Sequence, residues 1–386
     1  MNDIVILGAT GSIGQIALEC LNSLRKFRLK AITFNSDLVT AEKIVASFPS
    51  LEAVGIFNPE AAKAFQTKFP TLKVWAGVEA NLQVLNSFKG AFVVNALAGT
   101  AGILPSFKAI ENGSELALAN KETLVAGGDF FLRQSAKSQA KIYPIDSEHS
   151  ALYKLLRKER SADIRNLIIT ASGGSVRNVP FSSLPFLTPA EVLNHPTWSM
   201  GPKITVDSAT MANKAFEVIE AHILFGYDVE RIRVLLHDES LIHAGLEMVD
   251  GSIVFEAGPN DMRVPIIYAL NRMHRHQVSS ISPLDLEKSG RLNFRELEHE
   301  RYPLFSYILE ASQKGGTSPA AIIAADEEAV KAFLDGRIGF TEIFTVVRTV
   351  FNRCRIDSIE STDDIFYALK QAQVEARTVI SELERI

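Results

Sequence analysis

The stretch Ile4-Val-Ile-Leu-Gly-Ala-Thr-Gly-Ser-Ile-Gly14 decides the fold of the first part of this chain. The apolar run at 4–7 predicts a short strand, three glycines follow at three-residue spacing, and the next apolar residues repeat with a helical period. Glycines in such a turn let a ligand approach the backbone, and the N-terminus of the following helix offers N–H groups to a phosphate. We therefore predict a dinucleotide-binding turn, and a merely structural loop is the alternative.

Strand-like runs continue to alternate with helical patterns through residues 1–141. Further strands are predicted at 29–34, 91–96 and 114–119. This alternation predicts a parallel, doubly wound sheet with ligands at the carboxyl ends of its strands. Asn120, Lys121 and Glu122 follow one such strand, and the small residues of 97–102 follow another. We expect the α/β fold class, with a Rossmann-like sheet in this part of the chain.

The second predicted strand ends at Asn35-Ser-Asp37, where a Rossmann unit contacts the 2′-position of the adenosine ribose. An acidic residue there favours a 2′-hydroxyl, whereas a basic residue or a polar pocket favours a 2′-phosphate. Ser36 can donate to a phosphate and Asp37 repels one. An ordinary polar turn explains the same residues equally well, so this segment leaves the choice of cofactor open.

A second informative stretch is Ile142-Tyr-Pro-Ile-Asp-Ser-Glu-His149. Its apolar start predicts a strand that stops at Asp146. In an extended chain, residues two apart face the same side, so Asp146 and Glu148 would point into one pocket. Paired carboxylates suit a hard divalent cation such as Mg²⁺ or Mn²⁺. A solvated strand end is the alternative.

The segment after it predicts loops that bind a substrate. A helix at 150–160 and a strand at 164–170 lead into Ala171-Ser-Gly-Gly174, which can hold an anion or form an ordinary tight turn. Regular patterns then stop from 176 to about 203, and long loops of this kind often serve as lids. Trp198 and Met200 can close over a ligand there, although a core position for Trp198 is the alternative.

A helix is predicted to begin near Asp207 or Ser208, either of which can cap it. Asn213, Lys214 and Glu217 would share one side of this helix because they lie three and four residues apart. An amide, an ammonium and a carboxylate together suit a phosphorylated, metal-bound substrate. A surface ion pair between Lys214 and Glu217 is the alternative.

The remaining sequence predicts supporting structure. Strands at 232–236 and 253–256, with an Asp-Gly turn before the second, indicate a hairpin, and His237 and His243 nearby are interpreted as structural. Capped helical patterns at 320–333, after Thr341 and after Ser361 predict a helix bundle. We predict a cofactor domain at 1–141, a catalytic domain at 142–272 that contains the lid, a linker at 273–298 and a helical domain at 299–386.

The composition is that of an ordinary globular protein, with 47% hydrophobic and 22% charged residues among 386. A net charge of −5 without a basic run argues against nucleic acid as a partner. No apolar stretch approaches membrane-spanning length, and the two distant cysteines predict no disulfide framework. We therefore expect a cytoplasmic protein without a membrane partner.

Six motifs, taken together, resemble the 1-deoxy-D-xylulose 5-phosphate reductoisomerase family. They lie at 8–14, 119–123, 144–149, 170–174, 195–201 and 206–217, and a looser likeness continues through 259–265 and the helical tail. The resemblance implies a homodimeric enzyme of non-mevalonate isoprenoid biosynthesis. Its reaction would be the metal-dependent rearrangement and NADPH-dependent reduction of this phosphosugar to 2-C-methyl-D-erythritol 4-phosphate.

The resemblance also implies a role for each matching residue. One Mg²⁺, Mn²⁺ or Co²⁺ would be bound by Asp146, Glu148 and Glu217. The reacting atoms of the substrate would be contacted by Lys121, Ser147 and Glu148. Its phosphate and distal hydroxyls would be held by Ser172, Ser208, Asn213, Lys214 and His195, under a lid formed by Trp198 and Met200. The cofactor would be contacted by Gly8, Thr10, Gly11, Ser12, Ile13, Asn120, Glu122 and Gly201.

The segment Asn35-Ser-Asp37 departs from the family, whose members usually carry a basic residue there. We still expect NADPH, with Asn35, Ser36 and backbone N–H groups holding the 2′-phosphate. Two alternatives to the predicted activity are a reductase of a related phosphosugar and a nucleotide-binding regulatory protein without turnover. The presence of Asp146, Glu148, Glu217 and Lys121 argues against the regulatory alternative.

Overall fold

The computed structural model describes residues 1–196 and 200–384, and the chain forms two compact units. Unit 1 comprises residues 1–123, 131–150 and 261–282. Unit 2 comprises residues 124–130, 151–260 and 283–386. Two helices, α6 (Lys121–Ser138) and α7 (Ser147–Leu156), contribute residues to both units.

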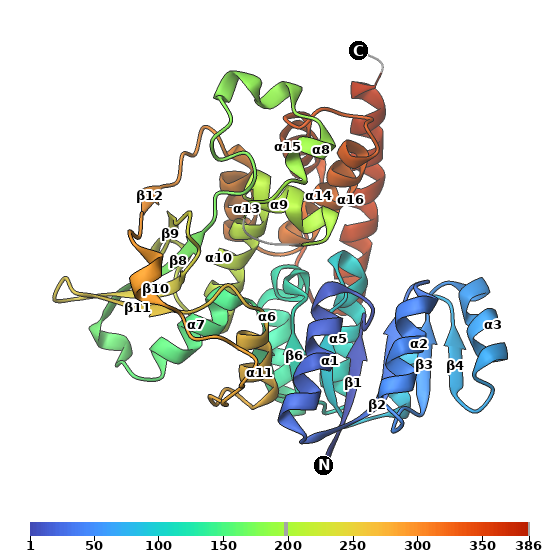
Figure 1. The fold of residues 1–386 in the computed structure, drawn as a ribbon. Helices are drawn as coiled ribbons and strands as arrows, with labels where there is room; N and C mark the ends of the chain where they lie inside the picture. The colour runs from blue at the N-terminus through green and yellow to red at the C-terminus, as the bar shows by residue number, and fades with distance from the viewer. Residues whose placement is uncertain (197–199, 385–386) are drawn as a thin grey trace. The chain divides into compact units, whose positions relative to one another are not determined.

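Unit 1 is built on a seven-stranded parallel sheet in the order β4-β3-β2-β1-β5-β6-β7 (Figure 1). Its strands are β1 (Asn2–Leu7), β2 (Phe27–Phe34), β3 (Ala53–Ile56), β4 (Lys73–Ala76), β5 (Phe92–Asn95), β6 (Leu116–Leu118) and β7 (Ile142–Pro144). The chain runs outward from β1 to β4 and then returns to the other side of β1, which places a topological switch point between β1 and β5. The predicted doubly wound, Rossmann-like sheet is therefore confirmed.

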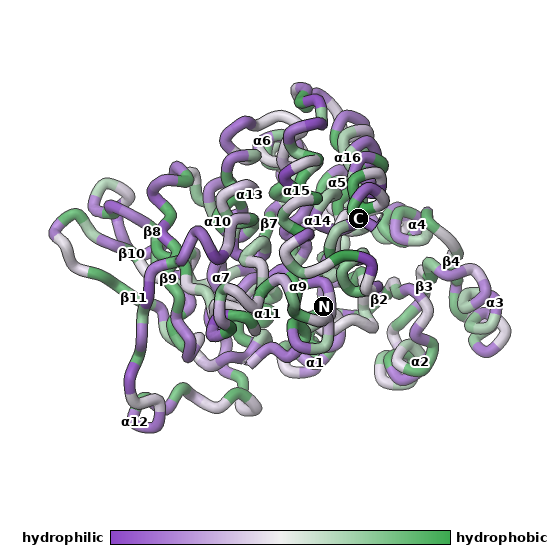
Figure 2. The backbone as a smooth tube through the Cα atoms, turned by 90° about the horizontal axis from the view of Figure 1, so that it is seen from above, coloured by the Kyte–Doolittle hydropathy of each residue, from purple (hydrophilic) through white to green (hydrophobic). Residues whose placement is uncertain are grey.

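Helices cover both faces of this sheet. They are α1 (Ser12–Leu24), α2 (Leu38–Ser47), α3 (Pro59–Lys68), α4 (Ala80–Ser87), α5 (Ile103–Glu111) and α11 (Arg263–Leu270). Figure 2 shows α2 and α3 on one side of the outer strands and α4 on the other. The central strand β1 is consequently buried on both faces, with Ile4 and Leu7 each 0% exposed.

Unit 2 contains a five-stranded mixed sheet in the order β11-β10-β8-β9-β12. Its strands are β8 (Ile164–Ala171), β9 (Ile232–Leu236), β10 (Ile242–Met248), β11 (Ile253–Ala257) and β12 (Arg295–Glu296). The Asp-Gly turn does form a hairpin, in which β11 pairs antiparallel with β10. The strand β10 was not predicted, and the predicted strand at 232–236 is β9, which pairs with β8 and β12 instead. β8 and β9 run parallel, with Ala171 opposite Leu236, so the residues that follow both strands emerge at one edge of the sheet.

The helices of unit 2 include the predicted bundle in the tail of the chain. They are α8 (Pro189–Val192), α9 (Pro202–Thr210), α10 (Ala212–Phe225), α12 (Leu286–Ser289), α13 (Pro303–Lys314), α14 (Ser318–Leu334), α15 (Glu342–Arg353) and α16 (Thr362–Leu383). Thr341 and Ser361 are the N-caps of α15 and α16, as predicted. The cap of α14 is Thr317 rather than Ser318, and α13 was not predicted.

The structure corrects the predicted conformation around Glu148. The strand β7 ends at Pro144, and helix α7 begins at Ser147, three residues before the predicted start. Glu148 therefore lies in the first turn of a helix and not in extended chain, so the same-face argument for Asp146 and Glu148 is wrong. The N–H of Ser150 donates to the carbonyl oxygen of Asp146 over 2.9 Å, which is how a helix begins.

A second correction concerns the helix predicted to begin at Asp207 or Ser208. Both residues lie inside α9, and the chain then breaks at Met211, whose φ is +63°. The next helix, α10, begins at Ala212 and carries Asn213 and Glu217. Met211 is 1% exposed, so side-chain burial accompanies a backbone conformation that a non-glycine residue rarely adopts.

Within residues 1–196 and 200–384, no helix combines the length and the apolar character that crossing a membrane requires.

Candidate active site

The glycine turn joins β1 to α1 beside the switch point of the parallel sheet. Gly8 has a φ of +77°, and a Cβ there would lie 2.8 Å from the carbonyl oxygen of Ala96. A Cβ on Gly14 would lie 2.3 Å from the carbonyl oxygen of Gly8. Backbone atoms thus occupy the space of a side chain at both positions. The N-cap of α1 is Gly11, which has no side chain to cap it, so the first N–H groups of this helix remain for a phosphate.

Asn120 and Glu122 bind the loop that follows β5. The Asn120 amide, 1% exposed, donates to the carbonyl oxygens of Leu97 and Gly99 over 3.0 and 2.8 Å. Glu122 accepts the Gly99 N–H over 3.2 Å and the Asn120 amide over 2.9 Å. The two predicted cofactor contacts therefore also hold in place the loop of small residues next to the switch point.

Asp37, in the segment expected to contact the ribose, is the N-cap of α2. Its carboxylate accepts the N–H of Thr40 over 3.1 Å. Hydrogen bonds from Thr40, first from its side chain and then from its backbone, hold the pKa of this carboxyl below its usual value. A helix cap is therefore one reason for an acidic residue at this position.

In unit 1, the carboxylate of Asp146 forms an ion pair with the buried Lys121. Lys121 Nζ lies 2.5 Å from Asp146 Oδ2, and the two side chains are 7% and 15% exposed. Ser147 Oγ donates to Glu148 Oε2 over 2.6 Å. His149 is 0% exposed, and one of its ring nitrogens lies within 4.8 Å of an Asp146 carboxylate oxygen. Sequence reasoning did not select His149, because a single histidine does not by itself indicate a metal site.

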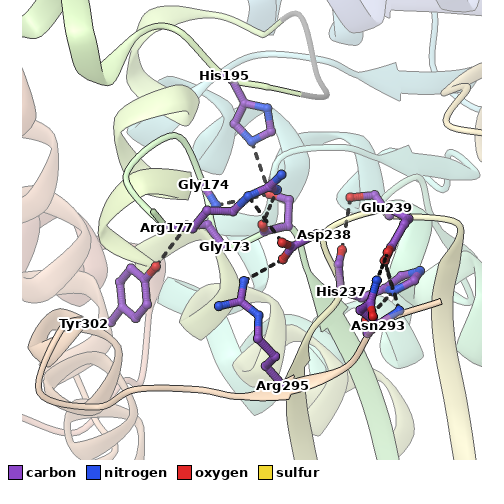
Figure 3. Close-up of polar contacts among 12 residues, drawn as sticks. Gly173, Gly174, Arg177, His195, His237, Asp238, Glu239, Asn293, Arg295 and Tyr302 are labelled. Atoms are coloured by element: carbon purple, nitrogen blue, oxygen red, sulfur yellow. Dashed lines mark hydrogen bonds and ion pairs between the residues drawn. The ribbon is translucent and has the colours of Figure 1, made fainter. Parts of the chain in front are cut away.

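In unit 2, His195 contacts two serine hydroxyls that are expected to hold a phosphate. Its Nε2 lies 3.2 Å from Ser172 Oγ, just after β8, and 3.3 Å from Ser208 Oγ on α9. Burial, and then the positive charge of Arg177, lower the pKa of His195. The imidazole is therefore uncharged at neutral pH and can both donate and accept a hydrogen bond. Figure 3 shows His195 above the Gly173–Gly174 turn.

The cluster predicted on α10 is also present in unit 2. Asn213 Nδ2 donates to Glu217 Oε1 over 2.5 Å, and Lys214 pairs with the other carboxylate oxygen. Lys214 and Glu217 are 5% and 4% exposed. The alternative of a surface ion pair is therefore excluded, and a buried ion pair of this kind requires further polar partners.

Besides His195, two predicted residues of the lid region lie in the described part of the chain. Met200 is half-buried, and Gly201 is the N-cap of α9. Trp198 lies outside the described residues, so the choice between lid and core for this residue stays open. The segment before it is not wholly irregular, because it contains a 3₁₀ turn at Phe181–Phe186 and the short helix α8.

A Rossmann-like sheet with a glycine phosphate turn, together with clustered carboxylates, lysines and hydroxyls, is typical of the class of nicotinamide-dependent oxidoreductases. Three family models match in order along the chain. They are 1-deoxy-D-xylulose 5-phosphate reductoisomerase at residues 4–128, its C-terminal domain at 142–225, and the DXP reductoisomerase C-terminal domain at 257–375.

Curated relatives and solved structures agree with these models. The 1-deoxy-D-xylulose 5-phosphate reductoisomerase of Bacillus pumilus is 41% identical over 385 residues, covering 99% of this chain and 100% of the relative. That of Halalkalibacterium halodurans is 41% identical over 384 residues, covering 98% and 100%. The enzyme from Zymomonas mobilis in complex with NADPH matches with a TM-score of 0.89 and 31% identity, covering 98% and 99%.

A further solved structure, DOX-P reductoisomerase in complex with NADPH, fosmidomycin and magnesium, matches with a TM-score of 0.91 and 31% identity, covering 99% of this chain and 98% of that chain. The chain belongs to the 1-deoxy-D-xylulose 5-phosphate reductoisomerase family. It is accordingly an enzyme of the oxidoreductase class, and the resemblance drawn from the six motifs is confirmed.

Proposed function

We infer that this chain converts 1-deoxy-D-xylulose 5-phosphate to 2-C-methyl-D-erythritol 4-phosphate, using NADPH and one divalent cation. The observation that carries this conclusion is an identity of 41% to a reductoisomerase over 99% of the chain. The nucleotide turn of unit 1 and the buried polar clusters of both units supply the groups that such a reaction uses. The reaction belongs to the non-mevalonate route of isoprenoid biosynthesis.

The proposed ligands of the cation are Asp146, Glu148 and Glu217. Their chemistry fits the group, because carboxylate oxygens are the donors that Mg²⁺ and Mn²⁺ prefer. Asp146 and Glu217 each pair with a lysine ammonium group, so a cation bound there would share these two carboxylates with Lys121 and Lys214. A bound cation supplies a Lewis acid that polarises the ketone and the adjacent hydroxyl of the substrate.

The side chains of the protein bind and orient the phosphosugar in this proposal. Lys121, Ser147 and Glu148 contact the reacting carbons and oxygens, and the Lys121 ammonium stabilises negative charge on oxygen. The phosphate and distal hydroxyls are held by Ser172, Ser208, Asn213, Lys214 and His195. Trp198 and Met200 cover the substrate and exclude water from the aldehyde that the rearrangement forms.

The proposed cofactor site begins at the glycine turn. Gly8, Gly11, Ser12 and Ile13 are placed to hold the pyrophosphate through backbone N–H groups, and Thr10 lies beside them. Asn120, Glu122 and Gly201 contact the cofactor further along, in addition to the structural hydrogen bonds of Asn120 and Glu122. The nicotinamide then delivers a hydride to the aldehyde carbon, and a proton completes the new hydroxyl.

Oxidation of NADPH in the presence of 1-deoxy-D-xylulose 5-phosphate tests the proposed reaction. We expect turnover with Mg²⁺ or Mn²⁺, none with EDTA, and recovery when the metal is restored. NADH in place of NADPH tests the cofactor preference separately. A folded protein that consumes neither nucleotide would refute the activity and favour the regulatory alternative. Faster turnover with a different phosphosugar would favour the related reductase.

Substitution of Asp37 should change the cofactor preference without unfolding the protein. We expect Asp37→Asn to lower the KM for NADPH severalfold, because it removes a negative charge near the proposed 2′-phosphate site. Asparagine is also a good helix N-cap, so the thermal unfolding midpoint should stay close to that of the wild type. Asp37→Ala is the matched control: it removes the same charge and should lose about 1 kcal/mol of stability. An unchanged KM in Asp37→Asn would place the 2′-phosphate elsewhere.

We propose a homodimer, which the exposed edge strand β11 supports. Ile253, Val254 and Phe255 are 48%, 37% and 36% exposed, and β11 is the end strand of its sheet among the described residues. An apolar edge strand of this kind favours association with another copy. Light scattering should therefore give twice the mass of the 42.4 kDa chain.

Ile253→Lys should weaken this dimer by about tenfold or more, because it places a charge on an apolar interface. Val374, which is 55% exposed on α16, provides the control variant Val374→Lys, which should leave the mass unchanged. A monomeric wild type, or a dimer equally stable in both variants, would contradict the proposed interface.

We propose the functional division into domains at 1–141, 142–272, 273–298 and 299–386, with the lid at about 176–203. This division differs from the compact units, because β7 and α11 belong to unit 1. We also propose that the protein is cytoplasmic. Both cysteines are free, Cys20 buried and Cys354 half-buried, which suits a reducing compartment.

A further inference from the structure

The turn after β8 in unit 2 is held by side chains that sequence reasoning did not select. Arg177 Nη1 donates to the carbonyl oxygen of Ser172 over 2.8 Å. Tyr302 Oη donates to the carbonyl oxygen of Gly173 over 3.0 Å, and burial raises the pKa of this phenol to about 12, so it keeps its proton at neutral pH. Figure 3 shows these side chains converging on the turn.

Arg177 is itself part of an alternating row of charges. Asp238 lies just after β9, and one of its carboxylate oxygens is 3.7 Å from Arg177 Nε. Its other oxygen lies 2.7 Å from Arg295 Nη2, on β12. The hydrogen bond to Asp238 raises the pKa of Arg295. A carboxylate between two guanidinium groups restricts the orientation of both, and Arg177 is also largely covered, with 15% of its side chain exposed.

The turn is shaped to receive Arg177. A Cβ on Gly173 would lie 3.0 Å from Arg177 Cβ, and Gly173 has a φ of +80°. The chain therefore leaves space for the stem of Arg177 at a position where most side chains would be strained. Ser172, which directly precedes this glycine, carries the hydroxyl that lies 3.2 Å from His195 Nε2. The hydrogen bond from Arg177 therefore holds the backbone of the residue that carries this hydroxyl, and the hydroxyl itself accepts the N–H of Gly174 over 3.3 Å.

We propose that Arg177, oriented by Asp238 and Arg295, is a positioning residue that fixes Ser172 and its partner His195 for binding the phosphate of the substrate. The proposal rests on the function inferred above, and it assigns the row Arg177, Asp238 and Arg295 to substrate affinity rather than to the chemical step. Arg177 acts through Ser172, and the two outer residues act through Arg177. Loss of each residue should therefore weaken substrate binding in the order of its distance from Ser172.

Steady-state kinetics of three variants test this order. Arg177→Gln should raise the KM for 1-deoxy-D-xylulose 5-phosphate about tenfold or more, because it removes a charged hydrogen bond. Asp238→Asn should raise it less, since Arg177 remains but loses its carboxylate partner, and Arg295→Gln should have the smallest effect. In each variant kcat and the KM for NADPH should stay within about threefold of the wild type. Arg177→Lys should give an intermediate KM, because one ammonium cannot reach both partners.

Arg301, which lies just before α13, provides a matched control because it donates to the same loop. Its guanidinium donates to the carbonyl oxygens of Val176 and Val179 over 3.3 and 2.8 Å. Arg301→Gln should lower thermal stability without the selective rise in KM. An equal rise in Arg301→Gln would mean that loop stability alone controls binding, and an unchanged KM in Arg177→Gln would also overturn the proposal. Asp238→Asn keeps the test valid if Arg177→Gln fails to fold.

Calorimetric titration with inorganic phosphate separates this proposal from the inferred activity. A wild type that binds phosphate several times more tightly than Arg177→Gln supports the positioning role even if it does not turn over the phosphosugar. Turnover by the wild type, with the same phosphate affinity and the same KM in Arg177→Gln, refutes the positioning role alone. A wild type that shows neither turnover nor phosphate binding refutes both.

Discussion

Replacing Asp146 by asparagine should lower kcat/KM for 1-deoxy-D-xylulose 5-phosphate by about a thousandfold or more, as expected when a charged ligand of a catalytic cation is removed. The change keeps the shape of the side chain but takes away the charge next to Lys121, whose Nζ lies 2.5 Å away. Kinetics over a range of Mg²⁺ and Mn²⁺ concentrations measure the effect. The metal concentration for half-maximal activity should rise together with the loss in rate.

Glu217→Gln should have an effect of similar size, and the double variant tests whether both residues serve one cation. If Asp146 and Glu217 bind the same ion, the loss in the double variant should be close to that of either single variant, because the site has already failed. Losses that multiply would indicate separate roles. Asp163→Asn, at a carboxylate 44% exposed on the surface of unit 2, is the control and should retain full activity. Normal activity and metal dependence in Asp146→Asn would refute the proposed metal ligand.

Gly14→Ala should abolish productive cofactor binding. The new Cβ would lie 2.3 Å from the carbonyl oxygen of Gly8 and 2.7 Å from the Cα of Ala9, and neither backbone atom can move without displacing the turn. We expect the affinity for NADPH to fall about a hundredfold or more and the free energy of unfolding to fall by about 1–3 kcal/mol, in the range found for overpacked sites. Fluorescence titration with NADPH and thermal unfolding measure the two effects.

Gly339→Ala is the control for this change. Its Cβ would meet only atoms at 3.4 Å or more, in ordinary van der Waals contact, so cofactor affinity and stability should change little. If Gly14→Ala binds NADPH as tightly as the wild type, the turn between β1 and α1 is not the pyrophosphate site.

Local patterns predicted β1, β2, β5 and β6 of the first unit because neighbouring residues specify them, whereas β3 (Ala53–Ile56) and β4 (Lys73–Ala76) were not predicted. The apolar run of β1, the glycines after it and the helical period of α1 lie within the first 24 residues. Parallel strands joined by helices have few possible arrangements, so the sheet could be inferred without knowing any long-range contact. The capped helices of the tail were predicted for the same reason.

The errors occurred where a local signal was missing or was given too little weight. Asp146 and Ser147 are residue types that favour helix starts, yet the apolar run before them suggested that extended structure continues to Glu148. At Met211 the chain adopts a φ of +63° without glycine or proline to indicate a break. Packing of a side chain that is 1% exposed accompanies that break, and a short sequence pattern does not record packing.

The sequence by itself determined the family, the nucleotide turn and the identity of the polar residues proposed for the site, because these depend on residue type and short spacing. Only the tertiary structure decided which charged side chains support Ser172. Arg177, Asp238 and Arg295 are far apart in the chain and meet because β8 pairs with β9, and β9 with β12. Strand pairing of this kind depends on burial over the whole sheet, and the charges themselves give no indication of it.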